Sequence, residues 1–198
     1  PNYNLSWKIL ASIYAKSGDS QNSIISSHNA IKADPNDAEA YSNLSLILFK
    51  FKRFKDALKN CQKGIEIKPD YAEGHFNLGN ILKALGKLTE AEKSYLNAIK
   101  LNSKFLAAHL NLASTYIQLN RLNEAESSYK RIIELKPDYA LVYSNMGSLY
   151  FKLKRNYEAE LSYNKAIHLN PNFIEAHFNM GVMFQKLNRS DEAELSFK

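Results

Sequence analysis

The sequence predicts an all-α protein, an α-solenoid of stacked helix–turn–helix units. Three observations lead to this fold class: residue types recur every 34 positions, apolar residues within each interval have helical spacing, and each interval contains two helix-breaking segments. A hairpin of two short helices leaves apolar flanks uncovered on both sides, so neighbouring units must stack to bury them. We therefore expect a fold without a single central core.

The interval of 34 residues is visible in four separate columns of the sequence. Prolines lie at Pro35, Pro69, Pro137 and Pro171, with Ser103 in the vacant position. Alanines recur at Ala57, Ala91, Ala125, Ala159 and Ala193, and asparagines at Asn43, Asn77, Asn111, Asn145 and Asn179. Small residues recur at Ala11, Ser45, Gly79, Ala113, Gly147 and Gly181. No insertion interrupts the interval, so the chain divides into units 4–37, 38–71, 72–105, 106–139 and 140–173 and a truncated sixth unit, 174–198.

Each unit is expected to begin with one helix, and the third unit shows why. Over residues 72–85, apolar residues such as Leu78 and Leu82 fall on one helical face. Asp70, which follows the proline of the linker, is positioned to cap the start of this helix. Gly86 then interrupts the helical pattern, which predicts a turn.

A second helix is expected after the turn. Thr89 and Glu92 have the spacing of a capping box, and Ala91 and Tyr95 lie on one face of the helix that follows. The helix is expected to end at the proline column, because proline cannot continue a helix. We expect Gly79 of the first helix and Ala91 of the second to lie where the two helix backbones approach closely.

A 34-residue helix–turn–helix with these columns resembles the tetratricopeptide repeat (TPR). In the third unit the resemblance rests on His75, Leu78, Gly79, Leu82, Ala91, Tyr95 and Ala98. It covers Asn4–Lys198 and implies a right-handed α-solenoid whose first helices line a concave surface. The run His-Phe-Asn-Leu-Gly-Asn is similar to the TPR region of O-linked N-acetylglucosamine transferases and related bacterial TPR proteins.

The asparagine column is the candidate binding feature of that surface. The resemblance implies that Asn43, Asn77, Asn111, Asn145 and Asn179 face a ligand in the concave groove. A carboxamide both donates and accepts hydrogen bonds, so it can hold the backbone of an extended peptide without reading its side chains. The alternative interpretation is that these amides form hydrogen bonds between adjacent helices. The sequence leaves both interpretations open.

Lysines and phenylalanines surround the asparagine column. Lys50, Lys83 and Lys152 are expected along one edge of the groove, and Phe76 and Phe178 add apolar surface to it. We expect these residues to tune the preference for a peptide or protein ligand. The alternative for each lysine is an ordinary solvated helix face, with the lysine stem lying on apolar surface.

No motif in the sequence indicates catalysis, a cofactor or a metal site. His75, His109 and His177 occupy one column with Tyr41 and other aromatic residues, which is typical of packing. Cys61 is the only cysteine, which excludes a disulfide scaffold and a multi-cysteine zinc site. A glycine-rich phosphate loop is absent from the sequence. The chain is therefore predicted not to be an enzyme.

Composition limits the classes of partner. The net charge of +6 comes from 21 Lys and only 5 Arg, without an aromatic–arginine platform, so a nucleic-acid partner is not expected. No apolar run approaches the roughly 18 residues that a membrane span requires, so no membrane partner is expected either. The low cysteine content is typical of a reducing compartment, and we expect a cytoplasmic location.

The two ends of the repeat array differ from its middle. The first unit carries Ile9 where the others carry asparagine. The last unit stops inside its second helix and leaves Met183, Phe184 and Phe197 with no following unit, so we expect a piece of a longer protein. The exposed C-terminal edge also predicts end-to-end self-association.

The sequence therefore predicts a non-catalytic scaffold that binds a protein or an extended peptide in its concave groove. Two alternatives remain open. The repeats could be the substrate-docking array of a larger, glycosyltransferase-like transferase, or they could form a self-associating scaffold.

Overall fold

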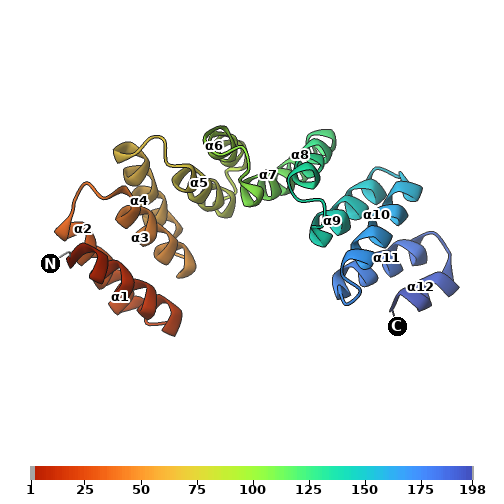
Figure 1. The fold of residues 1–198 in the computed structure, drawn as a ribbon, viewed down its shortest axis with the longest axis horizontal. Coiled ribbons are helices and arrows are strands. Elements are labelled where there is room, and N and C mark those ends of the chain that lie inside the picture. The colour runs from red at the N-terminus through yellow and green to blue at the C-terminus, as the bar shows by residue number, and fades with distance from the viewer. Residues whose placement is uncertain (1–2, 198) are drawn as a thin grey trace. The chain divides into compact units, whose positions relative to one another are not determined.

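The computed structural model describes residues 3–197, and every regular element in that range is an α-helix. Twelve helices within the described range follow one another as six helix–turn–helix pairs (Figure 1). The pairs are α1 (Tyr3–Ser17) and α2 (Ser20–Ala33), α3 (Ala38–Lys50) and α4 (Phe54–Ile67), α5 (Ala72–Ala84) and α6 (Leu88–Leu101), α7 (Leu106–Gln118) and α8 (Leu122–Leu135), α9 (Ala140–Lys152) and α10 (Asn156–Leu169), and α11 (Ile174–Lys186) and α12 (Ser190–Phe197). The predicted all-α fold class is confirmed; Lys198, the end of the sixth expected unit, lies outside the described residues.

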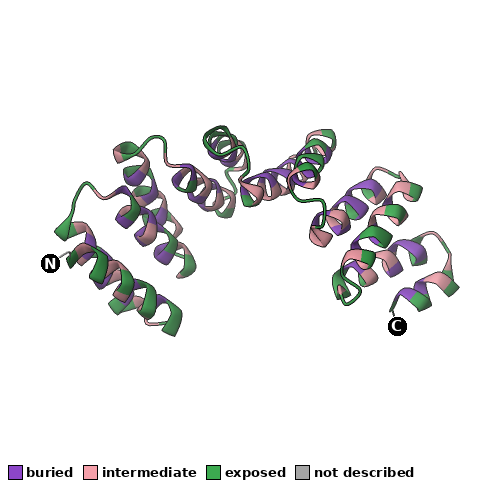
Figure 2. Ribbon diagram, viewed as in Figure 1, coloured by how far each residue is buried: buried purple, intermediate pink, exposed green. Residues whose placement is uncertain are grey.

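The chain forms two compact bodies, whose boundary falls within α7. In the N-terminal body, Pro1–Asn111, α2 packs on α3, α4 packs on α5, and the first helices α1, α3 and α5 pack successively on one another. In the C-terminal body, Leu112–Lys198, α9 packs on α8 and α11, and α10 packs on α11. Figure 2 shows buried residues along the facing sides of the helices within each body. The apolar surface is thus buried between helix pairs within each body.

The glycines of the small-residue column accommodate aromatic rings from the second helix of their own pair. A Cβ atom at Gly79 would lie 2.5 Å from the ring of Tyr95, and one at Gly147 would lie 2.7 Å from the ring of Tyr163. We expected two helix backbones to approach each other closely at Gly79. Instead, a fully buried ring fills the space against the glycine backbone, because the missing side chain leaves room for it.

The second helices α6 and α8 begin two residues earlier than the capping-box pattern predicts. The N-cap of α6 is Lys87, so Thr89 lies inside the first turn and the predicted capping box is wrong. The linker prediction is also wrong at Asp70, because Tyr71 is the N-cap of α5 and makes no side-chain capping bond. Asp37, by contrast, does cap α3 by accepting a hydrogen bond from the Ala40 backbone amide.

A basic residue before every second helix except α2 pairs with an acidic residue three positions later. The pairs in the described range are Arg53–Asp56, Lys87–Glu90, Arg121–Glu124, Arg155–Glu158 and Arg189–Glu192. Each acidic side chain lies in the first turn of its helix, where the positive end of the helix dipole stabilises a negative charge. This arrangement takes the place of the predicted capping boxes.

Two of these arginines also connect one second helix to the next. Arg155 Nη1 lies 2.7 Å from Glu126 Oε2 of α8, and its guanidinium lies over the ring of Tyr150 at 4.3 Å. Arg189 repeats the arrangement with Glu160 of α10 at 2.7 Å. The Glu126 carboxylate therefore bonds the following helix pair.

We expect Glu126 to contribute stability at neutral pH and to lose that contribution in acid. Burial raises the pKa of the Glu126 carboxyl. Hydrogen bonds from Lys130 and Arg155 together lower this pKa by more than burial raises it, so the net pKa lies below the ordinary 4.5. The contribution is therefore complete above about pH 4.5 and is lost as the pH falls through the lowered folded-state value. Glu126→Gln should lower the free energy of unfolding by about 1–2 kcal/mol at neutral pH and by much less in acid.

Urea unfolding at neutral and acidic pH measures this difference. Glu134→Gln is the matched control, because Glu134 pairs with Arg131 on the exposed surface of the same helix. Such exposed pairs contribute about 0–1 kcal/mol. A Glu126→Gln variant that shows the same small loss as Glu134→Gln at every pH would contradict the assigned role of the connecting ion pair.

Candidate functional site

Two asparagines of the column form hydrogen bonds between neighbouring first helices in the N-terminal body. Asn77 of α5 is 6% exposed, and its Nδ2 donates to Ser42 Oγ of α3 at 3.0 Å. Asn111 of α7 donates from Nδ2 to Asn80 Oδ1 of α5 at 2.7 Å, and the same oxygen accepts from the Tyr95 hydroxyl at 2.8 Å. Both amides therefore help to set the spacing of the first helices.

A third asparagine of the column lines a hollow between α1 and α3. Asn43 is half-buried on α3, and the hollow has a volume of about 330 Å³. Its lining consists of Lys8, Ser12, Ala15, Lys16, Asn43, Leu46, Ile47 and Lys50. This lining contains three lysines and no acidic residue, and it combines an amide with the exposed apolar side chain of Leu46. The hollow thus brings together two of the predicted site residues, Asn43 and Lys50.

The lysines of this hollow have different surroundings. Lys50 donates to the backbone carbonyl of Ala15, at the end of α1. Lys8 lies 3.0 Å from Asp37 and 2.8 Å from Glu39. Burial lowers the pKa of the Lys8 ammonium. Its hydrogen bonds to Glu39 and Asp37 together raise this pKa by more than burial lowers it, so the net pKa lies above the ordinary value. Lys16 is exposed at the rim.

The remaining predicted residues lie apart from this hollow. Asn145 on α9 and Asn179 on α11 are half-buried in the C-terminal body, and Lys152 is exposed at the end of α9. Lys83, at the last turn of α5, is half-buried, and burial lowers the pKa of its ammonium. Each of these residues lies on a first helix, as predicted.

The two phenylalanines of the predicted site differ in exposure. The ring of Phe76 lies 4.9 Å from that of Phe105 and 6.0 Å from that of Tyr95, so it packs among the helices. Phe178 on α11 is 57% exposed, and its ring lies 5.9 Å from that of Phe197. Phe178 therefore offers apolar surface, whereas much of the Phe76 ring is covered by its neighbours.

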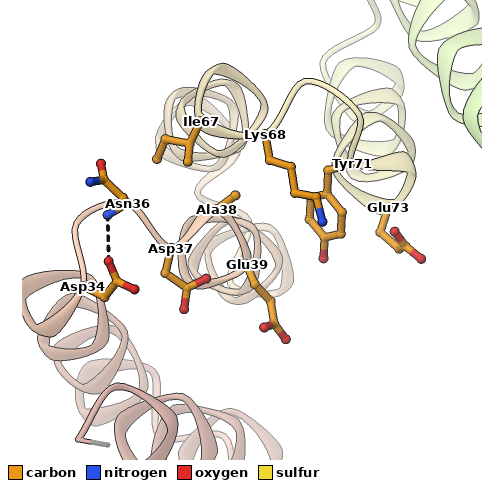
Figure 3. A pocket seen from close by; sticks show the side chains of 9 residues that line it. All are labelled: Asp34, Asn36, Asp37, Ala38, Glu39, Ile67, Lys68, Tyr71 and Glu73. Atoms are coloured by element: carbon orange, nitrogen blue, oxygen red, sulfur yellow. Dashed lines mark hydrogen bonds between the residues drawn. The ribbon is translucent and has the colours of Figure 1, made fainter.

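A second hollow, of about 680 Å³, lies beside the linkers that precede α3 and α5 (Figure 3). Its lining residues are Asp34, Asn36, Asp37, Ala38, Glu39, Ile67, Lys68, Tyr71 and Glu73. Figure 3 shows the Asp34 carboxylate accepting from the Asn36 backbone amide, and Asp37 and Glu39 of the same wall pair with Lys8. Sequence reasoning missed this hollow, because linker residues from two helix pairs form it.

Comparison with known proteins identifies the repeat. Tetratricopeptide repeat models match residues 76–140, 140–173 and 162–194, and a TPR repeat model matches residues 46–86. The chain belongs to the tetratricopeptide repeat family. No curated protein matches the sequence.

Solved structures of TPR proteins have the same fold. The Pseudomonas aeruginosa protein pilF is similar with a TM-score of 0.84 at 17% identity, over 98% of this chain and 88% of that one. The protein YrrB is described as a TPR protein with an unusual peptide-binding site. It is similar with a TM-score of 0.71 at 20% identity, over 86% of this chain and 88% of the YrrB chain. MamA from Desulfovibrio magneticus RS-1 is similar with a TM-score of 0.73 at 19% identity, over 81% of this chain and 91% of the MamA chain.

Histidines of the first helices bond the linkers of this TPR protein. Nε2 of His75 lies 2.9 Å from the Pro69 carbonyl, and Nε2 of His177 lies 2.9 Å from the Pro171 carbonyl. Tyr143 occupies the same column and donates to the equivalent carbonyl. Because a carbonyl only accepts, Nε2 carries the proton in both histidines. The column therefore serves a hydrogen-bonding role in addition to the packing role that we predicted.

The described residues of the TPR array offer no arrangement for metal or thiol chemistry. No group of three or more His, Cys, Asp or Glu side chains among them is placed to hold a metal ion. The buried thiol of Cys61 donates to the Gly74 carbonyl at 3.4 Å, and burial raises its pKa to about 12. Within residues 3–197, no helix has both the length and the apolar character to cross a membrane.

Proposed function

We propose that this TPR array is a non-catalytic interaction scaffold that binds an extended segment of another protein on the face of its first helices. The hollow between α1 and α3 carries the proposal, because Asn43 and three lysines share its wall with the exposed Leu46. The amide of Asn43 would hold ligand backbone, and Lys16 would attract a carboxylate or a backbone carbonyl. Asn145 and Asn179 would offer similar contacts within the C-terminal body.

The charge of this hollow favours a ligand with acidic residues. Lys8 is already paired with Asp37 and Glu39, but Lys16 and Lys50 add positive charge to a lining that itself carries no carboxylate, and this charge attracts an acidic side chain. The fold of YrrB, whose structure is described as having a peptide-binding site, supports peptide binding as a use of this architecture. In this proposal, Asn77 and Asn111 keep their structural bonds and position the helices that present the ligand-facing groups.

Selection from a displayed library of random peptides tests the proposal. We expect enriched peptides to contain acidic residues and to bind less tightly as salt concentration rises. Replacing both Asn43 and Lys16 by alanine should weaken a selected peptide about tenfold, because one amide and one ammonium contact are lost. Fluorescence anisotropy with the synthetic peptide measures the dissociation constant.

The matched control replaces an asparagine and a lysine of the second helices. Asn97 of α6 and Lys59 of α4 are both exposed, so a variant with alanine at these two positions has the same change in composition and charge. It should bind the selected peptide as the wild type does. Equal affinities for the wild type and for the Asn43 and Lys16 variant would refute the proposed site, as would a library that yields no binding peptide.

A further inference from the structure

The face of α3 that carries Asn43 has an acidic end and a basic end. Glu39, Asn43, Leu46 and Lys50 follow one another at helical spacing, so their side chains share one face of the helix. Glu39 lies in the first turn and Lys50 in the last turn. Their separation of eleven positions corresponds to about 16 Å along a helix axis. An amide and an exposed apolar side chain therefore lie between a carboxylate and an ammonium group on this face.

Each of these charges recurs on a neighbouring first helix. Lys16 in the last turn of α1 corresponds to Lys50, and both line the hollow between α1 and α3. Glu73 in the first turn of α5 corresponds to Glu39, and Figure 3 shows both side chains lining the hollow beside the linkers. Because α1, α3 and α5 pack successively on one another, like charges follow one another from helix to helix. We call Lys16 with Lys50 the basic edge, and Glu39 with Glu73 the acidic edge.

The acidic edge accepts an ammonium group within this chain. The ammonium of Lys8 lies 2.8 Å from Glu39 and 3.0 Å from Asp37. Glu73 is exposed, and its carboxylate forms no ion pair among residues 3–197. On the basic edge, Lys16 is exposed and forms no ion pair within the same range. Each edge therefore has a charged group that a ligand can reach.

We propose that the bound segment crosses the first helices in an extended conformation and carries acidic and basic side chains at alternate positions. This inference rests on the proposed function, because it concerns the same face and the same ligand. Acidic side chains of the segment point toward Lys16 and Lys50, and basic side chains point toward Glu39 and Glu73. Asn43 lies between the two edges and bonds the backbone of the segment. The occupant is thus a segment of another protein with both signs of charge, arranged to match the edges.

The alternation follows from the geometry of an extended chain. Successive side chains of such a chain point to opposite sides, so residues one or three positions apart face different edges. A segment that crosses α1, α3 and α5 stays between the two edges, because each edge keeps its sign from one helix to the next. A segment lying along α3 would instead pass from one edge to the other, with its basic and acidic side chains about five extended residues apart. Only the crossing arrangement uses Lys16 and Glu73, which lie on the helices beside α3, and we therefore favour it.

The peptides selected from the displayed library test this order of charges. We expect the enriched sequences to place basic residues one or three positions from the acidic ones, and not two. Moving a basic residue of the synthetic peptide by one position turns its side chain toward the basic edge, so binding should weaken about threefold, the size of an exposed ion pair. Enriched sequences without basic residues, or with basic residues only about five positions from the acidic ones, would overturn the alternating arrangement.

Neutralising the acidic edge gives a second measurement. Glu73→Gln should weaken the selected peptide about threefold in fluorescence anisotropy, because one ion pair is lost. A second peptide, in which glutamine replaces the basic residues, should bind this variant and the wild type equally. Glu66→Gln is the matched control and should bind both peptides as the wild type does, because Glu66 lies exposed on the second helix α4 and pairs with Lys63. Circular dichroism checks that both variants fold.

The outcomes separate this inference from the proposed function. Equal weakening of the two peptides by Glu73→Gln would overturn the inference, because Glu73 would then act without a basic partner in the ligand. Unchanged binding of the selected peptide to this variant would overturn it as well. If the variant with alanine at Asn43 and Lys16 still binds more weakly in either case, the proposed function stands without the alternating arrangement. A library that yields no binding peptide would overturn both.

Discussion

Replacing Tyr95 by alanine is expected to lower the free energy of unfolding by about 3–5 kcal/mol, the usual cost of deleting a buried aromatic ring. Tyr95 is fully buried, and its ring lies against the backbone of Gly79 and beside Phe76. The space left behind cannot close by a small shift, because helix backbone forms one wall of it. The hydroxyl adds a hydrogen bond to Asn80, which also accepts from Asn111.

Two variants separate the parts of this effect. Tyr95→Phe keeps the ring and removes only the hydroxyl, so it should cost about 1 kcal/mol. Tyr157→Ala removes a tyrosine that is 75% exposed on α10 and should change stability by less than about 0.5 kcal/mol. Urea unfolding gives the free energies, and hydrogen exchange shows whether α5 and α6 open before the rest of the array. A loss at Tyr95 as small as that at Tyr157 would contradict the packing role of the ring.

The fold could be predicted from the sequence because one physical rule recurs in every interval. Apolar residues such as Leu78 and Leu82 follow the helical period, and Gly86 interrupts it, so helix pairs follow directly. The first residue of each second helix is harder to predict, because two sequence patterns that can begin a helix overlap there. Thr89 with Glu92 and Lys87 with Glu90 both have a spacing of three residues, and the structure uses the second. Local pattern alone does not decide between them.

The candidate site could be located but not interpreted from the sequence. The interval places every asparagine of the column on a first helix, as the structure shows. Whether an amide faces a neighbouring helix or a ligand depends on the residue opposite, and that residue changes along the array. Asn77 meets Ser42 and bonds to it, whereas Asn43 lines a hollow. The 34-residue interval places both amides in one column and therefore does not distinguish the two cases.

Contacts between helix pairs explain the other omissions. Arg155 and Glu126 are 29 residues apart, so neither residue is near the other in the sequence, and only the stacking of the pairs brings them together. A signal was present, since basic residues recur at Arg53, Lys87, Arg121, Arg155 and Arg189 with the same interval as the prolines. Five charges at one position of a repeat indicate a repeated partner, and the acidic columns supply candidates.

Gly147→Leu is expected to be the second most damaging change, with a loss of about 3 kcal/mol from overpacking. A Cβ atom at this position would lie 2.7 Å from the ring of Tyr163, which is 2% exposed. Gly147→Ala should cost far less, because Ala113 and Tyr129 form the same pair with both residues buried. The alanine also gains about 1 kcal/mol of helix propensity over glycine, which offsets part of the strain.

Compensation from the facing residue is the stronger test of this pairing. The chain itself shows smaller partners in the same columns, with Ser45 opposite Cys61 and Ala11 opposite Ser27. Adding Tyr163→Ala to Gly147→Leu should therefore recover part of the lost free energy of unfolding. In a double-mutant cycle, the interaction free energy between the two substitutions should be about 1–3 kcal/mol. Additive losses from the two changes would show that the leucine is accommodated elsewhere, and that the glycine at this position is not there to admit the ring. Recovery would show that a larger residue in the small-residue column requires a smaller residue in the facing column. Paired changes of this kind would explain how the repeat varies at both positions and keeps its fold.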